Sequence, residues 1–148
     1  MKEKNMSVSN LLQSKGNAVY QVNENATLRE AILMLNSRNI GVVLVTDDAG
    51  SLTGILSERD IIRKSLTQET GFRDEPVSKT MTKKVLSVTP NTSIEEVMNI
   101  MSNSRIRHVP VLENGEIKGL VSIGDVVKRK IADAENEAAS LRDYISAG

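Results

Sequence analysis

The sequence contains the octapeptide Gly54-Ile55-Leu56-Ser57-Glu58-Arg59-Asp60-Ile61, which returns 65 residues later as Gly119-Leu120-Val121-Ser122-Ile123-Gly124-Asp125-Val126. Gly, Ser and Asp occupy the same places in both copies, and aliphatic residues share three further places. Such a short match can arise by chance, whereas a match that continues along the chain indicates a repeated folded unit.

The match continues toward the N-terminus of both copies. Val22 matches Val88, and Ile40 matches Ile106, each at a spacing of 66 residues. The spacing changes to 65 where Asp, Asn and Gly residues predict a hairpin turn, which tolerates a one-residue difference. The sequence therefore predicts two copies of one unit.

Each copy predicts the order strand, helix, strand, strand, helix, because alternating and helical apolar spacings follow each other in that order. Capping boxes at residues 27–30 and 93–96 mark the starts of the first helices. The predicted fold class is therefore α+β. The predicted elements are a helix over 8–15, an extended segment over 17–22, a helix from Leu28, strands over 40–45 and 52–56 and a helix from Ser57, then a helix from Ile94, strands over 109–112 and 117–121 and a helix from Ser122.

The chain divides into two repeats and two shorter segments. We predict that residues 1–66 form the first repeat with an N-terminal helix, 67–76 a linker, 77–131 the second repeat and 132–148 a C-terminal helix. The linker lacks periodicity and is rich in breakers, and Phe72 is expected to anchor it to the core. A half of about 65 to 70 residues is marginal alone, so we expect the halves to pack on each other.

The C-terminal helix carries an apolar stripe with 3-4-3-4 spacing, formed by Ile131, Ala134, Ala138, Leu141 and Ile145. A stripe two heptads long is too short to predict a coiled coil. Two interpretations stay open, a helix that lies on its own domain and a helix that contacts a second copy.

Charge and hydropathy exclude several classes of partner. The chain has 19 basic and 19 acidic residues and no net charge, which gives no support for nucleic-acid or membrane binding. The run Lys128-Arg129-Lys130 is typical of a solvated helix face. No apolar run approaches the roughly 18 residues of a membrane span, and no signal-peptide apolar region follows the first residues. We expect a cytoplasmic protein.

The residue types also exclude most enzyme chemistry. The chain has no cysteine and one histidine, His108, so it has no thiol nucleophile and no Cys/His metal site. No acidic loop has the spacing of calcium ligands. No nucleophile–base pair and no Walker-type loop can be assembled from these residues. We therefore expect no catalytic residues, no metal and no enzyme.

The repeated motif can bind an anion beside a sugar. At a strand-to-helix junction, the Ser hydroxyl and the free N–H groups of the first turn meet where the helix dipole is positive. The carboxylate of Asp60 or Asp125, at the third position of the helix, is suited to accept both hydroxyls of a ribose. Ser-x-x-Asp is also a common helix start, so the alternative is that both motifs only cap helices.

A second cluster, Arg107 and His108, leads into the strand beside the second motif. These cationic groups could meet a phosphate, or they could form a charged strand edge that deters aggregation. The matching residues of the first copy, Gly41 and Val42, carry no charge, and Arg59 is a partial replacement. We therefore predict unequal sites, with the stronger one at the second motif.

The strand-helix-strand-strand-helix halves, the paired motifs and the strand Arg107-His108-Val109-Pro110-Val111 together resemble the CBS-domain pair, or Bateman module. The resemblance covers the chain from about Val8 to Ile131. It implies tandem repeats packed through their sheets about a pseudo-twofold axis, with two clefts for adenosine-containing ligands such as AMP, ADP, ATP, NAD(H) or S-adenosylmethionine. It also implies homodimers that regulate a protein target.

The resemblance implies a role for most residues of the candidate site. Asp60 and Asp125 would bind ribose, Ser57 and Ser122 would lie near phosphate, the backbone near Val19 and Val85 would recognise the adenine edge, Arg107 and His108 would approach phosphate between the clefts, and Arg59 and Pro110 complete the set.

The sequence thus predicts a non-catalytic regulatory module that senses AMP, ADP, ATP or NAD(H) and acts on a partner in trans. The alternative is a constitutive interaction or dimerisation module without a physiological ligand. If the first hypothesis holds, Asp125→Ala should weaken binding more than Asp60→Ala, because Arg107 and His108 support the second motif.

Overall fold

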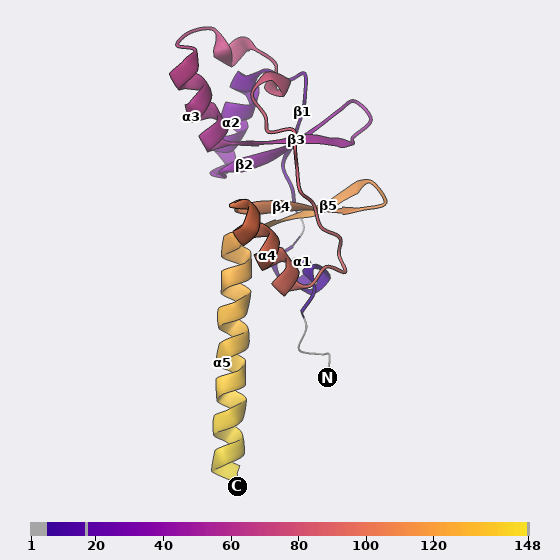
Figure 1. Cartoon of the computed structure of the whole chain (residues 1–148), viewed down its shortest axis with the longest axis vertical. Coiled ribbons are helices and arrows are strands. Elements are labelled where there is room, and N and C mark those ends of the chain that lie inside the picture. The colour runs from indigo at the N-terminus through magenta and orange to yellow at the C-terminus, as the bar shows by residue number, and fades with distance from the viewer. Residues whose placement is uncertain (1–5, 17, 148) are drawn as a thin grey trace.

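The structure, a computed structural model, describes residues 6–16 and 18–147, so the N-terminal residues 1–5, Asn17 and Gly148 lie outside it. Figure 1 shows two lobes whose strands face each other and whose helices lie on the outer sides, with one long helix extending away. The elements are α1 (Val8–Lys15), β1 (Gln21–Asn23), α2 (Leu28–Arg38), β2 (Val42–Thr46), β3 (Leu52–Ser57), α3 (Glu58–Thr67), two 3₁₀ turns (Phe72–Asp74 and Val77–Lys79), α4 (Ile94–Ser104), β4 (His108–Glu113), β5 (Glu116–Ser122) and α5 (Ile123–Ala147).

The first lobe has the predicted order of elements. β1 runs parallel to β2, and β2 runs antiparallel to β3 with Val43 opposite Leu56. Thr27 caps α2 by accepting a hydrogen bond from the N–H of Glu30, which is one of the two bonds of the predicted capping box. The predicted α+β class is therefore confirmed.

The second lobe departs from the prediction at its first strand. β4 and β5 form an antiparallel pair, but the expected strand before α4 is reduced to one parallel bridge between Val88 and Val111. In the first lobe the N–H of Glu24 continues the ladder by donating to the carbonyl of Thr46 at 2.8 Å. The matching residue is Pro90, which has no N–H to donate, so this ladder stops.

Each lobe has its own hydrophobic core, and the two sheets meet between the cores. Alternate residues of a strand point to opposite faces, and Val43 and Val45 face the first core while Val109 and Val111 face the second. Leu44, on the opposite face of β2, is nevertheless fully buried. Pro110 is buried in the matching place of β4, so these faces pack between the lobes.

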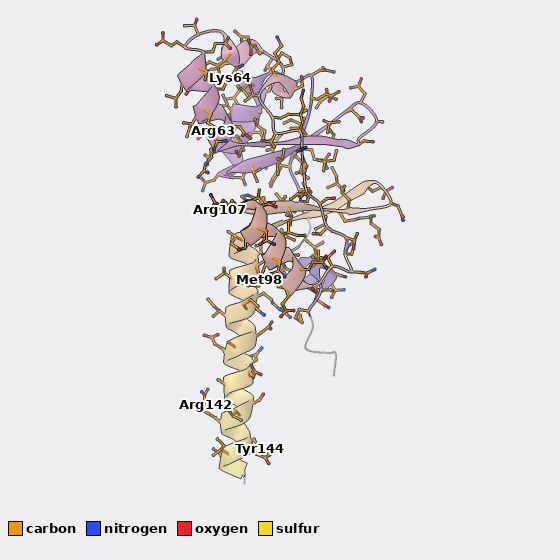
Figure 2. The ribbon with its side chains drawn as sticks, viewed as in Figure 1. Arg63, Lys64, Met98, Arg107, Arg142 and Tyr144 are labelled. Atoms are coloured by element: carbon orange, nitrogen blue, oxygen red, sulfur yellow. The ribbon has the colours of Figure 1, made fainter. Side chains whose placement is uncertain are left out.

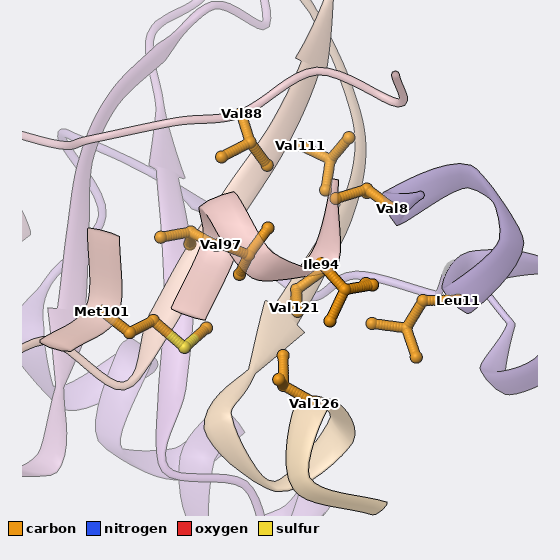
Figure 3. Close-up of a cluster of buried hydrophobic side chains, with 10 residues drawn as sticks. Val8, Leu11, Val88, Ile94, Val97, Met101, Val111, Val121 and Val126 are labelled. Atoms are coloured by element: carbon orange, nitrogen blue, oxygen red, sulfur yellow. The ribbon is translucent and has the colours of Figure 1, made fainter. Parts of the chain in front are cut away.

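Segments that precede the two repeats complete the two cores. Val8 and Leu11 of α1 lie in the core of the second lobe (Figure 3), although the helix precedes the first repeat in sequence. Phe72 and Val77 lie in the core of the first lobe, which confirms the expected anchoring of the linker by Phe72. The N-terminal helix therefore belongs with the first repeat along the chain but packs with the second in space.

The C-terminal helix is a continuation of the second repeat. α5 runs unbroken from Ile123 to Ala147 and crosses the expected boundary between residues 131 and 132. No proline interrupts this stretch, and its only glycine is Gly124 in the first turn. The helix leaves the second lobe and extends beyond it (Figure 1).

The glycine of each motif lies where another segment crosses the strand. A Cβ on Gly54 would lie 2.9 Å from the carbonyl oxygen of Thr82 and would also collide with Met81. A Cβ on Gly119 would lie 2.8 Å from the Cδ2 atom of Leu12 in α1. The motif glycines therefore let the crossing segments approach the sheets, a packing role that the sequence did not reveal.

We expect Gly54→Ala to lower the free energy of unfolding by about 1–3 kcal/mol through overpacking. Hydrogen bonds with Ile55 of 2.9 and 3.0 Å hold the backbone of Thr82 in place. Gly119→Ala should cost less, because the end of the Leu12 side chain can rotate away. Gly124→Ala, which meets nothing closer than 3.7 Å, is the control and should leave stability equal or higher. Urea unfolding measures all three, and equal losses at Gly54 and Gly119 would contradict this account.

Candidate functional site

A cleft of about 440 Å³ lies between the lobes at the start of α3. Its walls come from β2, β3 and α3 of the first lobe, from the connection over residues 82–86, and from residues 105–108 of the second lobe. Its volume falls within the range of small-ligand pockets, about 300–1,000 Å³. The apolar part of its lining is aliphatic and consists of Val42, Ile55, Val85, Leu86 and Ile106.

The first repeated motif forms one wall of this cleft. The Oγ of Ser57 accepts a hydrogen bond from the N–H of Asp60 at 3.2 Å, and Oδ2 of Asp60 accepts one from the N–H of Ser57 at 3.0 Å. This reciprocal pair is a capping box at the start of α3. The hydroxyl of Thr82 lies 3.3 Å from Oδ1 of Asp60, so the carboxylate also faces the crossing segment.

Cationic side chains outnumber carboxylates around the cleft. The lining includes the cations Arg59, Arg63, Lys84, Arg105 and Arg107, whereas its carboxylates are those of Glu58 and Asp60. Figure 2 shows Arg63 of the first lobe and Arg107 of the second on the same side of the molecule, where the lobes meet. The excess of positive charge in a concave surface attracts anions.

Three of these cations were not predicted from the sequence. Arg63 follows Arg59 by four residues on α3, a spacing that places both on one helix face, and Lys84 belongs to a Lys-Lys pair in the connection between lobes. Arg105 ends α4 in the left-handed region, with φ of 55°. The matching residue of the first repeat, Asn39, has φ of 54° and suits this conformation better than arginine does.

The second motif has a different electrostatic environment. Ser122 and Asp125 form the same reciprocal hydrogen bonds, of 2.9 and 3.1 Å, at the start of α5. The ammonium of Lys15, at the end of α1, lies 2.8 Å from Oδ2 of Asp125 and donates to the carbonyl of Leu120 at 2.7 Å. A cation of the protein itself therefore neutralises this carboxylate.

The pKa values beside the second motif follow from this arrangement. Burial opposes ionisation of Asp125, but the hydrogen bonds from Lys15 and Ser122 outweigh it and hold the pKa of Asp125 below its usual value. Burial also lowers the pKa of His108, the charges of Lys15 and Arg107 lower it further, and the charge of Asp125 opposes them. The lowered pKa favours the neutral form of His108 at pH 7.

The structure brings together only part of the predicted site. The cleft is lined by Ser57, Arg59, Asp60, Val85, Arg107 and His108. Four other predicted residues, Val19, Pro110, Ser122 and Asp125, lie outside its lining, and Pro110 is buried in β4 with its carbonyl accepting from the N–H of Val88 at 3.0 Å.

The expected pairing of Arg107 with the second motif needs correction. The backbone of Arg107 does lie beside that motif, since its carbonyl accepts a hydrogen bond from the N–H of Ile123 at 2.8 Å. Arg107 nevertheless lines the cleft that contains Ser57 and Asp60, because the residues before β4 reach across the interface between lobes. More cationic side chains therefore surround the first motif than the second.

Within residues 6–16 and 18–147, no group of three or more His, Cys, Asp or Glu side chains has the geometry of a metal site. The same residues include no helix with the length and apolarity needed to cross a membrane.

Comparisons with known proteins place this chain and its fold in one family. The chain is 32% identical to the CBS domain-containing protein CBSX3, mitochondrial, of Arabidopsis thaliana, over 95% of this chain and 72% of that relative. The crystal structure of the CBS-domain containing protein ATU1752 from Agrobacterium tumefaciens matches with a TM-score of 0.82 and 38% identity, over 88% of this chain and 97% of that one.

A further solved structure contains bound adenosine compounds. It is the CBS domain pair of protein MJ0100 in complex with 5′-methylthioadenosine and S-adenosyl-L-methionine, with a TM-score of 0.72 and 25% identity over 83% of this chain and 98% of that one. The family model for the CBS domain matches this chain twice, over residues 16–67 and 77–131. The chain therefore belongs to the CBS domain family and is a tandem pair of CBS repeats.

Proposed function

We propose that this chain is a non-catalytic regulatory module that binds AMP, ADP, ATP or NAD(H) in the cleft at the first motif and acts on a partner in trans. The observation that carries the proposal is the convergence of Ser57 and Asp60 with cations from both lobes in one cleft. An adenine nucleotide combines an apolar base, a ribose diol and an anionic phosphate, and the cleft offers a matching surface for each.

The charge of the cleft selects among adenosine compounds. The MJ0100 domain pair supports an adenosine-containing ligand, because its crystal structure contains two of them. Five cationic side chains around our cleft favour ligands with phosphate groups. S-Adenosylmethionine carries a positive sulfonium and no phosphate, so this cleft should bind it less well.

Each part of the ligand has a proposed contact. The carboxylate of Asp60 accepts the ribose hydroxyls, replacing the hydroxyl of Thr82 that lies beside it. Aliphatic side chains enclose the base, whose polar edge meets the backbone near Val85. Arg63 and Arg107 approach the phosphates from opposite lobes (Figure 2).

A ligand in this cleft would couple the two repeats. It would contact α3 of the first lobe and residues 105–108 of the second, and would favour the relative arrangement in which both contacts are made. The carbonyl of Arg107 binds the N–H of Ile123, the first residue of α5. Movement of Arg107 toward a phosphate would therefore shift the start of the long helix, which is the proposed output.

A second candidate function is a constitutive interaction module. The capping boxes at Ser57–Asp60 and Ser122–Asp125 favour it, because both motifs already use their side chains to start helices. On this alternative the cations would be a solvated surface. Nucleotide binding and its loss on substitution of Asp60 separate the two functions.

Isothermal titration calorimetry with ATP, AMP, NADH and S-adenosylmethionine tests the ligand. We expect at least one phosphate-bearing nucleotide to bind with a Kd below about 1 mM, and S-adenosylmethionine to bind more weakly. Affinity for ATP should fall more steeply with salt than affinity for AMP, because more charge is screened. 2′-Deoxy-ATP is the control for the ribose contact and should lose affinity. Absence of binding by all four ligands below millimolar concentration would favour the constitutive module.

Asp60→Ala and Asp125→Ala each remove one capping box, and Asp125→Ala also removes the ion pair with Lys15. We expect Asp60→Ala to weaken nucleotide binding about tenfold or more, the loss for hydrogen bonds to a charged group. Asp125→Ala should change affinity much less, because Lys15 already occupies that carboxylate. The sequence alone predicted the larger loss of affinity for Asp125→Ala. A larger loss for Asp125→Ala than for Asp60→Ala would therefore contradict the assignment of the ligand to the first motif.

Arg105→Asn separates ligand binding from stability. Asparagine tolerates the left-handed conformation of this position, so the free energy of unfolding should stay equal or rise by up to about 1 kcal/mol. Nucleotide affinity should nevertheless fall several-fold, because a cation of the cleft is lost. Lys118→Asn, which removes an exposed cation outside the cleft, is the control. An unchanged affinity in Arg105→Asn would show that this arginine has no ligand contact.

A further inference from the structure

The long helix α5 exposes an apolar face that its own lobe does not cover. Val126 and Arg129 face the lobe, since Val126 is fully buried and Arg129 is partly buried. Ile131, Leu141 and Ile145 are instead 54%, 61% and 68% exposed, and the stripe continues beyond the lobe (Figure 1). Of the two interpretations of this stripe, the helix that lies on its own domain is therefore excluded.

The stripe has the spacing of a coiled-coil seam. Val127, which lies four residues before Ile131 and is 48% exposed, extends the stripe toward the N-terminus. From Val127 to Ile145 the stripe then alternates steps of four and three residues over nearly three heptads. Ile131, Ala138 and Ile145 occupy the a positions, and Val127, Ala134 and Leu141 occupy the d positions. Isoleucine at a and leucine at d favour a two-stranded parallel coiled coil, and Ile131, Ile145 and Leu141 fit this preference.

The charged residues beside the seam complement a second copy of the same helix. In a parallel pair, each g position lies next to the e position of the following heptad on the other helix. Lys130 then faces Glu135 of the second copy, and Glu137 faces Arg142 of the second copy. By symmetry each pair occurs twice, so both rims of the seam are joined by opposite charges.

An antiparallel pair of the same helices lacks this complementarity. Keeping the apolar layers in contact would place Lys128 opposite Arg142, and Glu135 and Glu137 opposite their own copies. These like-charge contacts would oppose association. The pattern therefore specifies both the partner and its direction.

The free side chains of α5 are compatible with this pairing. Within the described part of the chain, Glu137 and Arg142 form no ion pair. Lys130 lies 3.2 Å from Glu95, but both side chains are exposed and such a pair stabilises little. Ala134 and Ala138 leave a shallow hollow bordered by Leu141 and Tyr144, which permits close approach of a second helix.

We propose that α5 pairs with α5 of a second copy as a parallel, in-register coiled coil over residues 127–145. The pairing places the second CBS repeats of the two copies side by side at the start of the coil. Residues 127–145 are not among those that line the nucleotide cleft, so loss of the pairing would leave the cleft itself intact.

Charge reversal on the full chain tests the partner and the direction. Sedimentation velocity should show a dimer that dissociates as concentration falls through the micromolar range. Arg142→Glu should weaken the dimer at least tenfold, because Glu137 would face a carboxylate. Adding Glu137→Arg to the same chain should restore dimerisation. Asp143→Lys, on the outer face, reverses a charge of equal size and should have no effect.

A cysteine scan checks the register, since the chain contains no cysteine. Leu141→Cys should form a disulfide-linked dimer under mild oxidation, because d positions face each other in a parallel pair, whereas Asp143→Cys should not. A folded monomer at high concentration, a dimer insensitive to Arg142→Glu, or equal crosslinking at 141 and 143 would each overturn the proposal. Circular dichroism confirms that every variant remains folded.

Discussion

Two pairs of main-chain hydrogen bonds join the lobes to segments from elsewhere in the chain. One pair connects the start of α4 to the start of α1, and the other connects the start of α2 to the linker. The N–H groups of Val8 and Ile94 donate to Thr92 and Met6 at 2.8 and 2.9 Å, and Val77 and Leu28 donate to Ala26 and Glu75 at the same two distances. Through these bonds α1 covers the second core as the linker covers the first. A CBS repeat of about 55 residues would otherwise leave much of its core in water.

The same crossing segments make the two motifs unequal. In the first lobe the crossing chain continues past Gly54, brings the hydroxyl of Thr82 to Asp60 and carries Lys84 into the cleft. In the second lobe the crossing element is α1, whose last residue, Lys15, forms an ion pair with Asp125. The two similar octapeptides thus have different electrostatic surroundings. The first lies in a cleft lined by cations, whereas Lys15 neutralises the carboxylate of the second.

Much of the fold could be predicted from the sequence because its signals are local. Hairpin turns and helix starts need only neighbouring residues, so both strand hairpins, the helix starts and both Ser-x-x-Asp caps were placed correctly. The first strand of the second lobe was overestimated because Pro90 removes one donor from the ladder. Arg63, Lys84 and Arg105 were missed because they come from three separate segments and meet only in the folded chain.

The sequence by itself determined the duplication, the α+β repeats, the helix caps and the heptad pattern of α5, since each depends on spacings along the chain. The tertiary structure alone decided which core α1 completes, which motif Arg107 joins and which face of α5 stays exposed. Such pairings depend on contacts between residues far apart in the chain, as between Lys15 and Asp125. No local pattern specifies these contacts, because they follow from the packing of the two lobes against each other.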